Sequence, residues 1–196
     1  MDLQLHRDRT LRKLTNEKGV YALCDLDGVP IYIGQSTDGI RTRVRRHLTS
    51  ARSDVIANRQ LDIWEISEVW GWPLPGAQKA DINKLEHYLI HLHNDSSPLV
   101  NGDIPPRSAV VPTVPDKQAV QIMPDEEIEE RKDPDRRLPR QLESMVSLFS
   151  HILEVKNNVH QRRMLRVHFN RTKSYYEKFM EESGDEPYIT SADSEE

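Results

Sequence analysis

The sequence predicts an α+β protein, with a small three-stranded antiparallel sheet flanked by helices, a proline-rich linker and a helical C-terminal arm. Three observations lead to this fold class. Two short apolar runs are joined by a tight-turn sequence, two segments carry apolar residues at helical spacing, and the composition changes after residue 102. Together they indicate a sandwich-like α/β unit at the N-terminal side, followed by elements of a different kind.

The first element is a β-hairpin. Residues 19–24 and 29–34 are apolar, and the pair Asp27-Gly28 lies between them. Asp-Gly between apolar runs is a strong hairpin signal, because glycine accepts the positive φ that tight turns require. Residues 60–70 alternate between apolar and polar side chains and predict a third strand.

Two amphipathic helices are predicted beside these strands. Ile40, Val44 and Leu48 recur at a spacing of four, with arginines between them, which predicts a helix with a basic outer face. Residues 80–93 carry apolar residues on one face, and the turn-forming residues 94–98 end that helix. The first domain is therefore expected to span residues 1–103.

The rest of the chain is predicted as a linker, an arm and a tail. Residues 104–139 contain seven prolines and an acidic run, and such aperiodic sequence is typical of a linker. Helical periodicity returns in residues 140–180, and the acidic residues 181–196 are expected to be disordered. The arm carries an apolar stripe that is expected to dock on the first domain or on a second copy of the chain, as a homodimer; it consists of Leu142, Val146, Phe149 and Leu153.

Charge is distributed unevenly along the chain. The net charge is −5, but residues 1–101 balance 13 basic against 13 acidic side chains, and the deficit lies in the second half. Residues 41–59 hold six arginines against the single acid Asp54. This local basic patch is compatible with a nucleic-acid partner, because distribution matters more than the sum. The basic stretch of the arm, near residues 162–173, is either a second contact with DNA or a solvated face.

Neither a membrane nor a disulfide role is indicated. The chain has no apolar run long enough to cross a bilayer and no apolar signal-peptide core, so a soluble cytoplasmic protein is expected. The single cysteine, Cys24, lies in an apolar run and is interpreted as a buried core residue rather than a catalytic thiol.

The first hundred residues also hold side chains suited to phosphodiester cleavage, which requires an oriented nucleophile and cations that offset charge on the phosphate. Tyr21 and Tyr32 lie on the two hairpin strands and are expected on the same face. Arg43 can bind a phosphate through both of its terminal nitrogens, and His47 follows one helical turn later. Glu86 on the second helix offers a hard oxygen ligand for Mg²⁺.

Five motifs in order resemble those of the GIY-YIG nuclease superfamily. Gly19-Val20-Tyr21 and Tyr32-Ile33-Gly34 resemble its two signature triplets, with valine in place of the name-giving isoleucine. Residues 40–47 resemble its arginine helix, Leu85-Glu86 its metal-binding motif, and Pro98-Leu99-Val100-Asn101 its final element. The resemblance covers about residues 17–103, and the ordered set is far more specific than either triplet alone.

The resemblance implies an endonuclease that cleaves DNA with one divalent ion, Mg²⁺ or Mn²⁺, held by Glu86. Tyr21 and Tyr32 would act as the base and its positioning partner, in an order that the sequence leaves open. Arg43 would stabilise the transition state, with Arg41 as a competitor for that role. His47 would assist proton transfer or phosphate binding.

Further residues complete the predicted site. Asn101 would brace it through hydrogen bonds. Nucleic-acid contacts are expected from four further arginines of the basic patch, which are Arg41, Arg45, Arg46 and Arg52.

Each of these side chains also has an ordinary structural interpretation. The tyrosines could pack as strand residues, the arginines could be solvated, and Asn101 could shape a turn. His87 and His91 are four residues apart but lack an evident third metal ligand. Trp64 is expected to pack, whereas Trp70 and Trp72 could pack or stack on bases. The alternative function is a catalytically inactive nucleic-acid-binding or scaffold protein that retains the nuclease fold.

Overall fold

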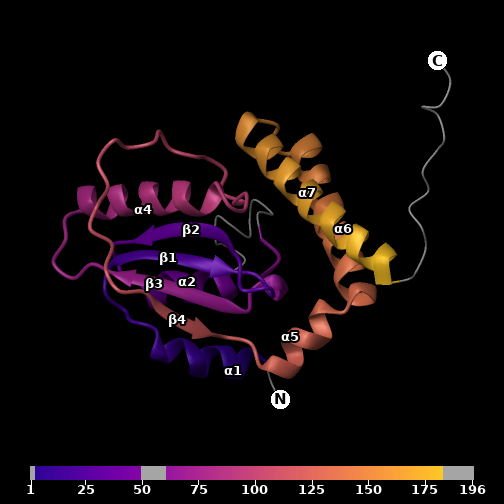
Figure 1. The fold of residues 1–196 in the computed structure, drawn as a ribbon, viewed down its shortest axis with the longest axis horizontal. Helices are drawn as coiled ribbons and strands as arrows, with labels where there is room; N and C mark the ends of the chain where they lie inside the picture. The colour runs from indigo at the N-terminus through magenta and orange to yellow at the C-terminus, as the bar shows by residue number, and fades with distance from the viewer. Residues whose placement is uncertain (1–2, 50–60, 183–196) are drawn as a thin grey trace.

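The computed structural model describes residues 3–49 and 61–182. Its centre is an antiparallel sheet with strand order β2-β1-β3-β4 (Figure 1). The strands are β1 (Gly19–Cys24), β2 (Pro30–Ser36), β3 (Glu68–Pro73) and β4 (Gln118–Gln121). The predicted hairpin is confirmed as β1 and β2.

The sheet has four strands rather than the predicted three. β4 pairs with β3 and lies inside the segment interpreted as linker. Val120 is buried there, and Ile122 and Met123 after it are fully buried. Prolines before and after this short strand concealed it, because four residues give too little alternation to stand out in sequence.

The third strand begins later than predicted. Residues 63–65 form a 3-10 helix, η2 (Ile63–Glu65), and the strand occupies Glu68–Pro73. The side chain of Asp62 accepts a hydrogen bond from the backbone of Trp64 and caps this turn. Of the apolar residues that suggested alternation in this stretch, Ile63 lies in the helical turn and Val69 in the strand.

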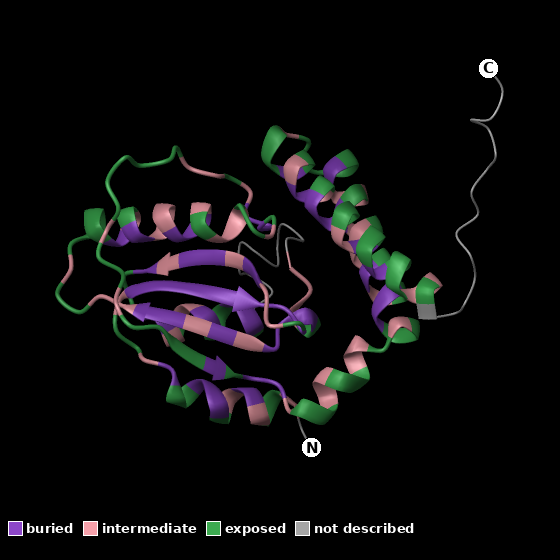
Figure 2. Ribbon diagram, viewed as in Figure 1, coloured by how far each residue is buried: buried purple, intermediate pink, exposed green. Residues whose placement is uncertain are grey.

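Helices cover both faces of the sheet. On one face, α2 (Ile40–Thr49) packs with η1 (Leu11–Lys13), which continues from α1 (Leu3–Thr10), over a core that includes Tyr21. On the other face, α4 (Lys79–Asn94) packs over a core that includes Cys24. Figure 2 shows the buried inner surfaces of both layers. Cys24 has no exposed surface, and burial raises the pKa of its thiol, as expected for a core residue.

The C-terminal elements are more regular than the sequence suggested. Three helices follow β4: α5 (Asp125–Lys132), α6 (Pro134–Glu154) and α7 (Val159–Glu182). Asp133 caps α6 and Pro134 occupies its first turn, where a proline lacks no necessary hydrogen bond. The prolines that indicated a linker thus include one that starts a helix. In the segment predicted as tail, residues 181 and 182 end α7, and the rest lie outside the described residues.

In the described part of the chain, the apolar stripe of the arm is exposed rather than docked on the first domain. Its residues are 42–65% exposed: Leu142, Val146, Phe149 and Leu153. The opposite face of α6 is buried instead, where Leu148 and Ile152 pack with Met164 of α7. Docking of the stripe on the first domain was therefore a wrong expectation, while its use by a second copy stays a prediction.

A buried polar network holds the arm to the sheet domain. Glu65, 3% exposed, accepts hydrogen bonds from Arg137, Arg140 and Gln141 of α6. Arg171 of α7 pairs with Asp25 in the β1–β2 turn. Burial raises the pKa of the Glu65 carboxyl, and the two arginines of α6 oppose that shift. The arm is thus fixed through charges that sequence inspection did not connect.

Among the helices formed by residues 3–49 and 61–182, none combines the length and hydropathy that crossing a bilayer requires.

Candidate active site

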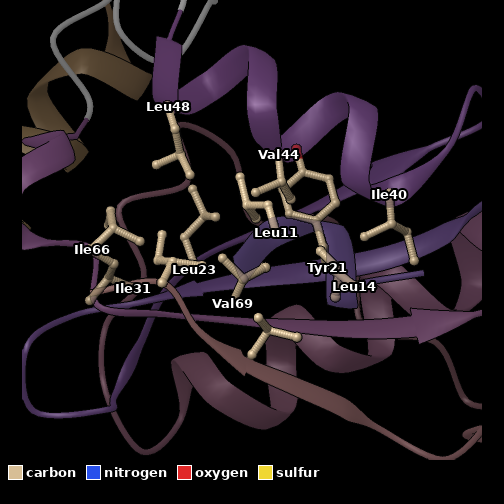
Figure 3. Packing of buried hydrophobic residues seen from close by; sticks show 12 residues of the cluster. Leu11, Leu14, Tyr21, Leu23, Ile31, Ile40, Val44, Leu48, Ile66 and Val69 are labelled. Carbon is tan, nitrogen blue, oxygen red and sulfur yellow. The ribbon is translucent and has the colours of Figure 1, made fainter. Parts of the chain in front are cut away.

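The two tyrosines lie on the same face of the hairpin, as predicted. Tyr21 of β1 is opposite Gly34 of β2, and Tyr32 is opposite Leu23, two residues further along. Because side chains alternate along a strand, both phenols emerge toward α2. Their ring centroids are 6.3 Å apart. Figure 3 shows the ring of Tyr21 pointing from β1 toward α2 beside Val44.

Gly34 makes room for the Tyr21 phenol. A Cβ added at Gly34 would lie 2.5 Å from the Tyr21 Oη and 2.9 Å from a ring carbon of Tyr32. Both contacts are closer than atoms can approach. The glycine of the second triplet is therefore required for space between the two rings.

His47 contacts the buried phenol directly. Its Nε2 lies 2.6 Å from the Tyr21 Oη, and its ring centroid is 5.9 Å from that of Tyr32. His47 is 2% exposed, so α2 buries it together with Val44 and Leu48 rather than presenting it to solvent. Although His47 follows Arg43 by one helical turn, its imidazole therefore lies in the core beneath α2, next to the two phenol rings.

Burial dominates the ionisation of Tyr21. It raises the pKa of this phenol well above the ordinary value, and the nearby Tyr32 raises it further. Arg43 lowers the pKa through its charge and a hydrogen bond to the phenol. Tyr21 is consequently neutral near pH 7 and suited to holding or passing a proton.

Glu86 approaches from the other side of the sheet. It projects from α4, and Gln35 of β2 donates a hydrogen bond from Nε2 to its Oε2 over 2.8 Å. Burial raises the pKa of Glu86 to about 7, an effect that the bond from Gln35 partly offsets. Because β2 is an edge strand, residues from both helical layers meet around it.

Asn101 braces this edge. Its Nδ2 donates to the carbonyl oxygen of Ile33 over 2.7 Å, and its Oδ1 accepts from the amide of Ile33 over 3.1 Å. Val100 donates its amide to Ile31 over 2.7 Å. The side chain of Asn101 therefore makes the two hydrogen bonds with the backbone of Ile33 that a neighbouring strand would otherwise make.

These elements enclose a cleft of about 520 Å³. Tyr32, Arg43, Glu86 and Asn101 line it together. Tyr21 and His47 lie behind this lining, in the core under α2. Four of the six predicted catalytic residues thus share one cleft, and the remaining two touch each other beneath it.

Residues of the arm line the same cleft, and sequence reasoning missed them. They come from the α6–α7 turn and the start of α7, and include Lys156, Asn158, His160 and Gln161. No spacing in the sequence relates them to the hairpin, since more than a hundred residues lie between. The bond from Gln35 to Glu86 joins residues 51 positions apart and was not predicted from the sequence.

The other arginines of α2 point away from the cleft or into solvent. Arg41 donates to the carbonyl oxygen of Arg12, and Arg45 pairs with Asp8 over 3.2 Å, both beside α1 and η1. Arg46 is exposed, and Arg52 lies outside the described residues. This arrangement favours Arg43 over Arg41 for the role at the reacting phosphate.

The histidines of α4 do not form a metal cluster with each other. His87 lines the cleft, whereas His91 binds the carbonyl oxygen of Pro105 over 2.7 Å. Within the described part of the chain, no group of three His, Cys, Asp or Glu side chains is placed to hold a metal.

The tryptophans are engaged in packing. Trp72 is buried, and Trp70 packs beside it under Lys117, whose Nζ is 3.4 Å from the Trp70 ring centroid. Trp64 is 39% exposed and lies between the guanidinium groups of Arg7 and Arg131. These contacts favour packing over base stacking for Trp70 and Trp72.

A single divalent ion fits the donors at Glu86. The carboxylate faces the cleft, and the Oε1 of Gln35 beside it is a buried oxygen without a hydrogen-bond partner among the described residues. Mg²⁺ prefers oxygen ligands and keeps several of its waters, so one carboxylate can hold it. A cation there would also offset the burial that raises the pKa of Glu86.

Fold and cleft together define a class: an α+β protein with two phenols, a guanidinium and the carboxylate of Glu86 gathered at the edge of an antiparallel sheet. Comparison with family models identifies the family within that class. Residues 17–99 match the GIY-YIG catalytic domain, which supports the assignment of this part of the chain to the GIY-YIG nuclease superfamily. The resemblance seen in the sequence is thereby confirmed, and nucleases of this family generally depend on a divalent metal. Searches of curated proteins and of solved structures found no match.

Proposed function

We propose that this protein is an endonuclease that hydrolyses phosphodiester bonds in DNA, with one divalent ion and assistance from tyrosine. The observation that supports it is the shared cleft of Tyr32, Arg43 and Glu86, which come from β2, α2 and α4. A phosphate in this cleft meets a phenol, a guanidinium and a carboxylate at once. Each supplies one requirement of the reaction.

Glu86 would hold the ion, Mg²⁺ or Mn²⁺. When bound, the ion supplies charge stabilisation for the phosphate oxygens. Arg43 would bind the same phosphate through two nitrogens and stabilise the charge that grows in the transition state. The bond from Gln35 would orient the carboxylate of Glu86 toward the cleft.

The two phenols would have different roles. Tyr32 lines the cleft and, in its phenolate form, would orient the attacking water and accept its proton. Tyr21 lies deeper, with its Oη against His47 Nε2, and would position Tyr32 and Arg43. Asn101 would keep β2 in register beneath both rings.

DNA is the substrate that the basic helix favours. Arg45 and Arg46 are exposed on α2, and Arg41 and Arg52 would add to this patch. The main alternative is a catalytically inactive protein that binds nucleic acid or serves as a scaffold. The fit of the cleft residues to cleavage chemistry argues for the enzyme.

Plasmid nicking in Mg²⁺ tests the proposal. Glu86→Gln keeps the size of the side chain but removes its charge, and nicking should fall by about 100-fold or more. Glu143→Gln is the matched control, because Glu143 is an exposed carboxylate on α6 outside the cleft, and it should nick as the wild type does.

DNA binding in a chelator separates the two hypotheses. Glu86→Gln should still bind DNA, because its predicted binding arginines are intact. If the wild type binds nucleic acid but cleaves no duplex, branched or single-stranded substrate with Mg²⁺ or Mn²⁺, the inactive alternative replaces the endonuclease.

A further inference from the structure

We infer that the C-terminal arm forms a wall of the cleft, and that Lys156 there binds a second phosphate of the nucleic-acid backbone. This inference rests on the proposed function and adds a substrate-binding subsite to it. The subsite lies on the turn between α6 and α7, outside the family match at residues 17–99.

The first observation is the lining of the cleft. Lys156, Asn158 and His160 border the same space as Arg43 and Glu86. Lys156 follows the last turn of α6 and is exposed, so its ammonium group is open to an incoming strand. The arm thereby brings a second basic side chain to a cleft whose sheet-domain lining includes the acids Glu86 and Asp103.

The second observation is that the arm is locked to the brace of the site. Arg163 of α7 donates to the carbonyl oxygens of Leu99, over 3.0 Å, and of Asn101, and to the Asn94 Oδ1 over 2.9 Å. His160 binds the carbonyl oxygen of Gly102 over 2.9 Å. The segment that holds β2 through Asn101 is therefore also the segment on which the arm rests.

These contacts give two arginines in the basic stretch of α7 a structural role. Arg163 and Arg171 have carbonyl and carboxylate partners inside the protein, so they fix the arm rather than contact DNA. Among the described residues of the arm, Lys156 at the turn is the lysine or arginine that lines the cleft. A nucleic-acid strand carries a phosphate at every nucleotide. When Arg43 binds one phosphate, the flexible ammonium group of Lys156 is suited to bind an adjacent phosphate of the same strand.

A structural role for Lys156 is the competing explanation. A cation after the last turn of a helix interacts favourably with the helix dipole, whatever the function. That role predicts an effect on stability but none on the salt dependence of DNA binding. The two explanations are therefore separable by measurement.

The experiment uses the full chain with Glu86→Gln, in EDTA, so that binding is measured without cleavage. Affinities for a 5′-fluorescein 20-base-pair duplex and for its single strand are measured by anisotropy over a range of KCl concentrations. Lys156→Ala should raise the Kd about 3- to 10-fold at low salt and reduce the salt slope by about one. Lys156→Arg should restore both values.

Lys173→Ala is the control, because Lys173 is an exposed lysine of α7 that pairs with Glu177 and does not line the cleft. It should leave the Kd and the slope unchanged. Equal affinity and slope for Lys156→Ala and its parent would overturn the inference.

Cleavage by variants with intact Glu86 distinguishes this failure from that of the proposed function. If the wild type cleaves DNA and Lys156→Ala has the same kcat/KM, only the subsite is wrong. If the wild type cleaves nothing but Lys156→Ala binds more weakly, the endonuclease is wrong and the subsite stands. If the chain binds no nucleic acid at all, both are wrong.

Discussion

At the scale of single residues, the geometry of the candidate site depends on the space around the two phenol rings and on the burial of the side chains. Tyr21 is 1% exposed and His47 2%, so their contact is shielded from water. Tyr32 and Arg43 reach the cleft from beside this pair. A neutral phenol held against an imidazole can exchange a proton without losing its position, which makes the pair suitable for a supporting role.

Gly34→Ala tests whether this arrangement depends on the gap between the two rings. The added methyl would lie 2.5 Å from the Tyr21 Oη, so the phenol must move. Cleavage should fall by about 10-fold or more, because ångström-scale displacements of catalytic groups slow reactions strongly. Circular dichroism checks that the fold is retained.

Gly34→Ala introduced into the Tyr21→Phe variant supplies the control. Phenylalanine lacks the clashing oxygen, so Gly34→Ala should cost less in this background, which a double-mutant cycle measures. Additive effects of the two changes would show that Gly34 acts by another route.

At the scale of elements, the edge strand β2 and the helix α6 are the important ones. β2 carries Tyr32 toward α2 and Gln35 toward α4, and the segment ending at Asn101 protects its free edge. α6 docks through Arg137, which is 4% exposed and binds Glu65, Asp27 and the hydroxyl of Tyr175. The arm is therefore anchored by charge, not by its apolar stripe.

Removal of Arg137 should release this anchor. Arg137→Ala leaves the buried Glu65 with fewer cations, and the free energy of unfolding should fall by about 3 kcal/mol, measured in urea. Arg107→Ala removes an exposed partner of Asp95 and should cost at most about 1 kcal/mol. A loss for Arg137→Ala as small as that for Arg107→Ala would mean that the network does not hold the arm.

At the scale of the whole molecule, the burial of Glu86 couples its ionisation to folding. Glu86 has a pKa of about 7 in the folded chain against 4.5 for an ordinary glutamate. The folded state thus binds its proton more tightly than the unfolded state does. Without metal, the contribution of Glu86 to stability decreases as pH rises from about 4.5 to about 7, and stays low above that.

Thermal unfolding in EDTA tests this coupling. Glu86→Gln has no such titration, so its stability relative to wild type should increase across that pH range, by up to about 3 kcal/mol. Mg²⁺ should raise the Tm of the wild type at pH 8 more than at pH 5, because only the ionised carboxylate binds it. A stability difference between wild type and Glu86→Gln that does not vary with pH would contradict the assignment.

Glu143→Gln is the control for the pH series. Glu143 is exposed on α6, so its removal should give a pH profile parallel to the wild type. If the stability of Glu143→Gln relative to wild type changed with pH as steeply as that of Glu86→Gln, the effect would be due to general surface charge.

The sequence alone determined the hairpin, the helices α2 and α4 and the resemblance to the family. Those features follow from local rules: Asp27-Gly28 sets a turn, apolar spacing sets helices, and ordered motifs mark the triplets, Glu86 and Asn101. The same rules put Tyr21 and Tyr32 on one face, because a strand has a period of two.

Only the tertiary structure decided which distant segments of the chain pack around these local elements. It added β4 to the sheet, moved the third strand to Glu68–Pro73, and brought the turn at Lys156 to the cleft. It also turned Arg41 toward Arg12 and placed Arg43 in the lining of the cleft. These outcomes depend on contacts between residues far apart in the chain, such as Glu65 with Arg137, and no periodicity records which distant partner a buried charge will find.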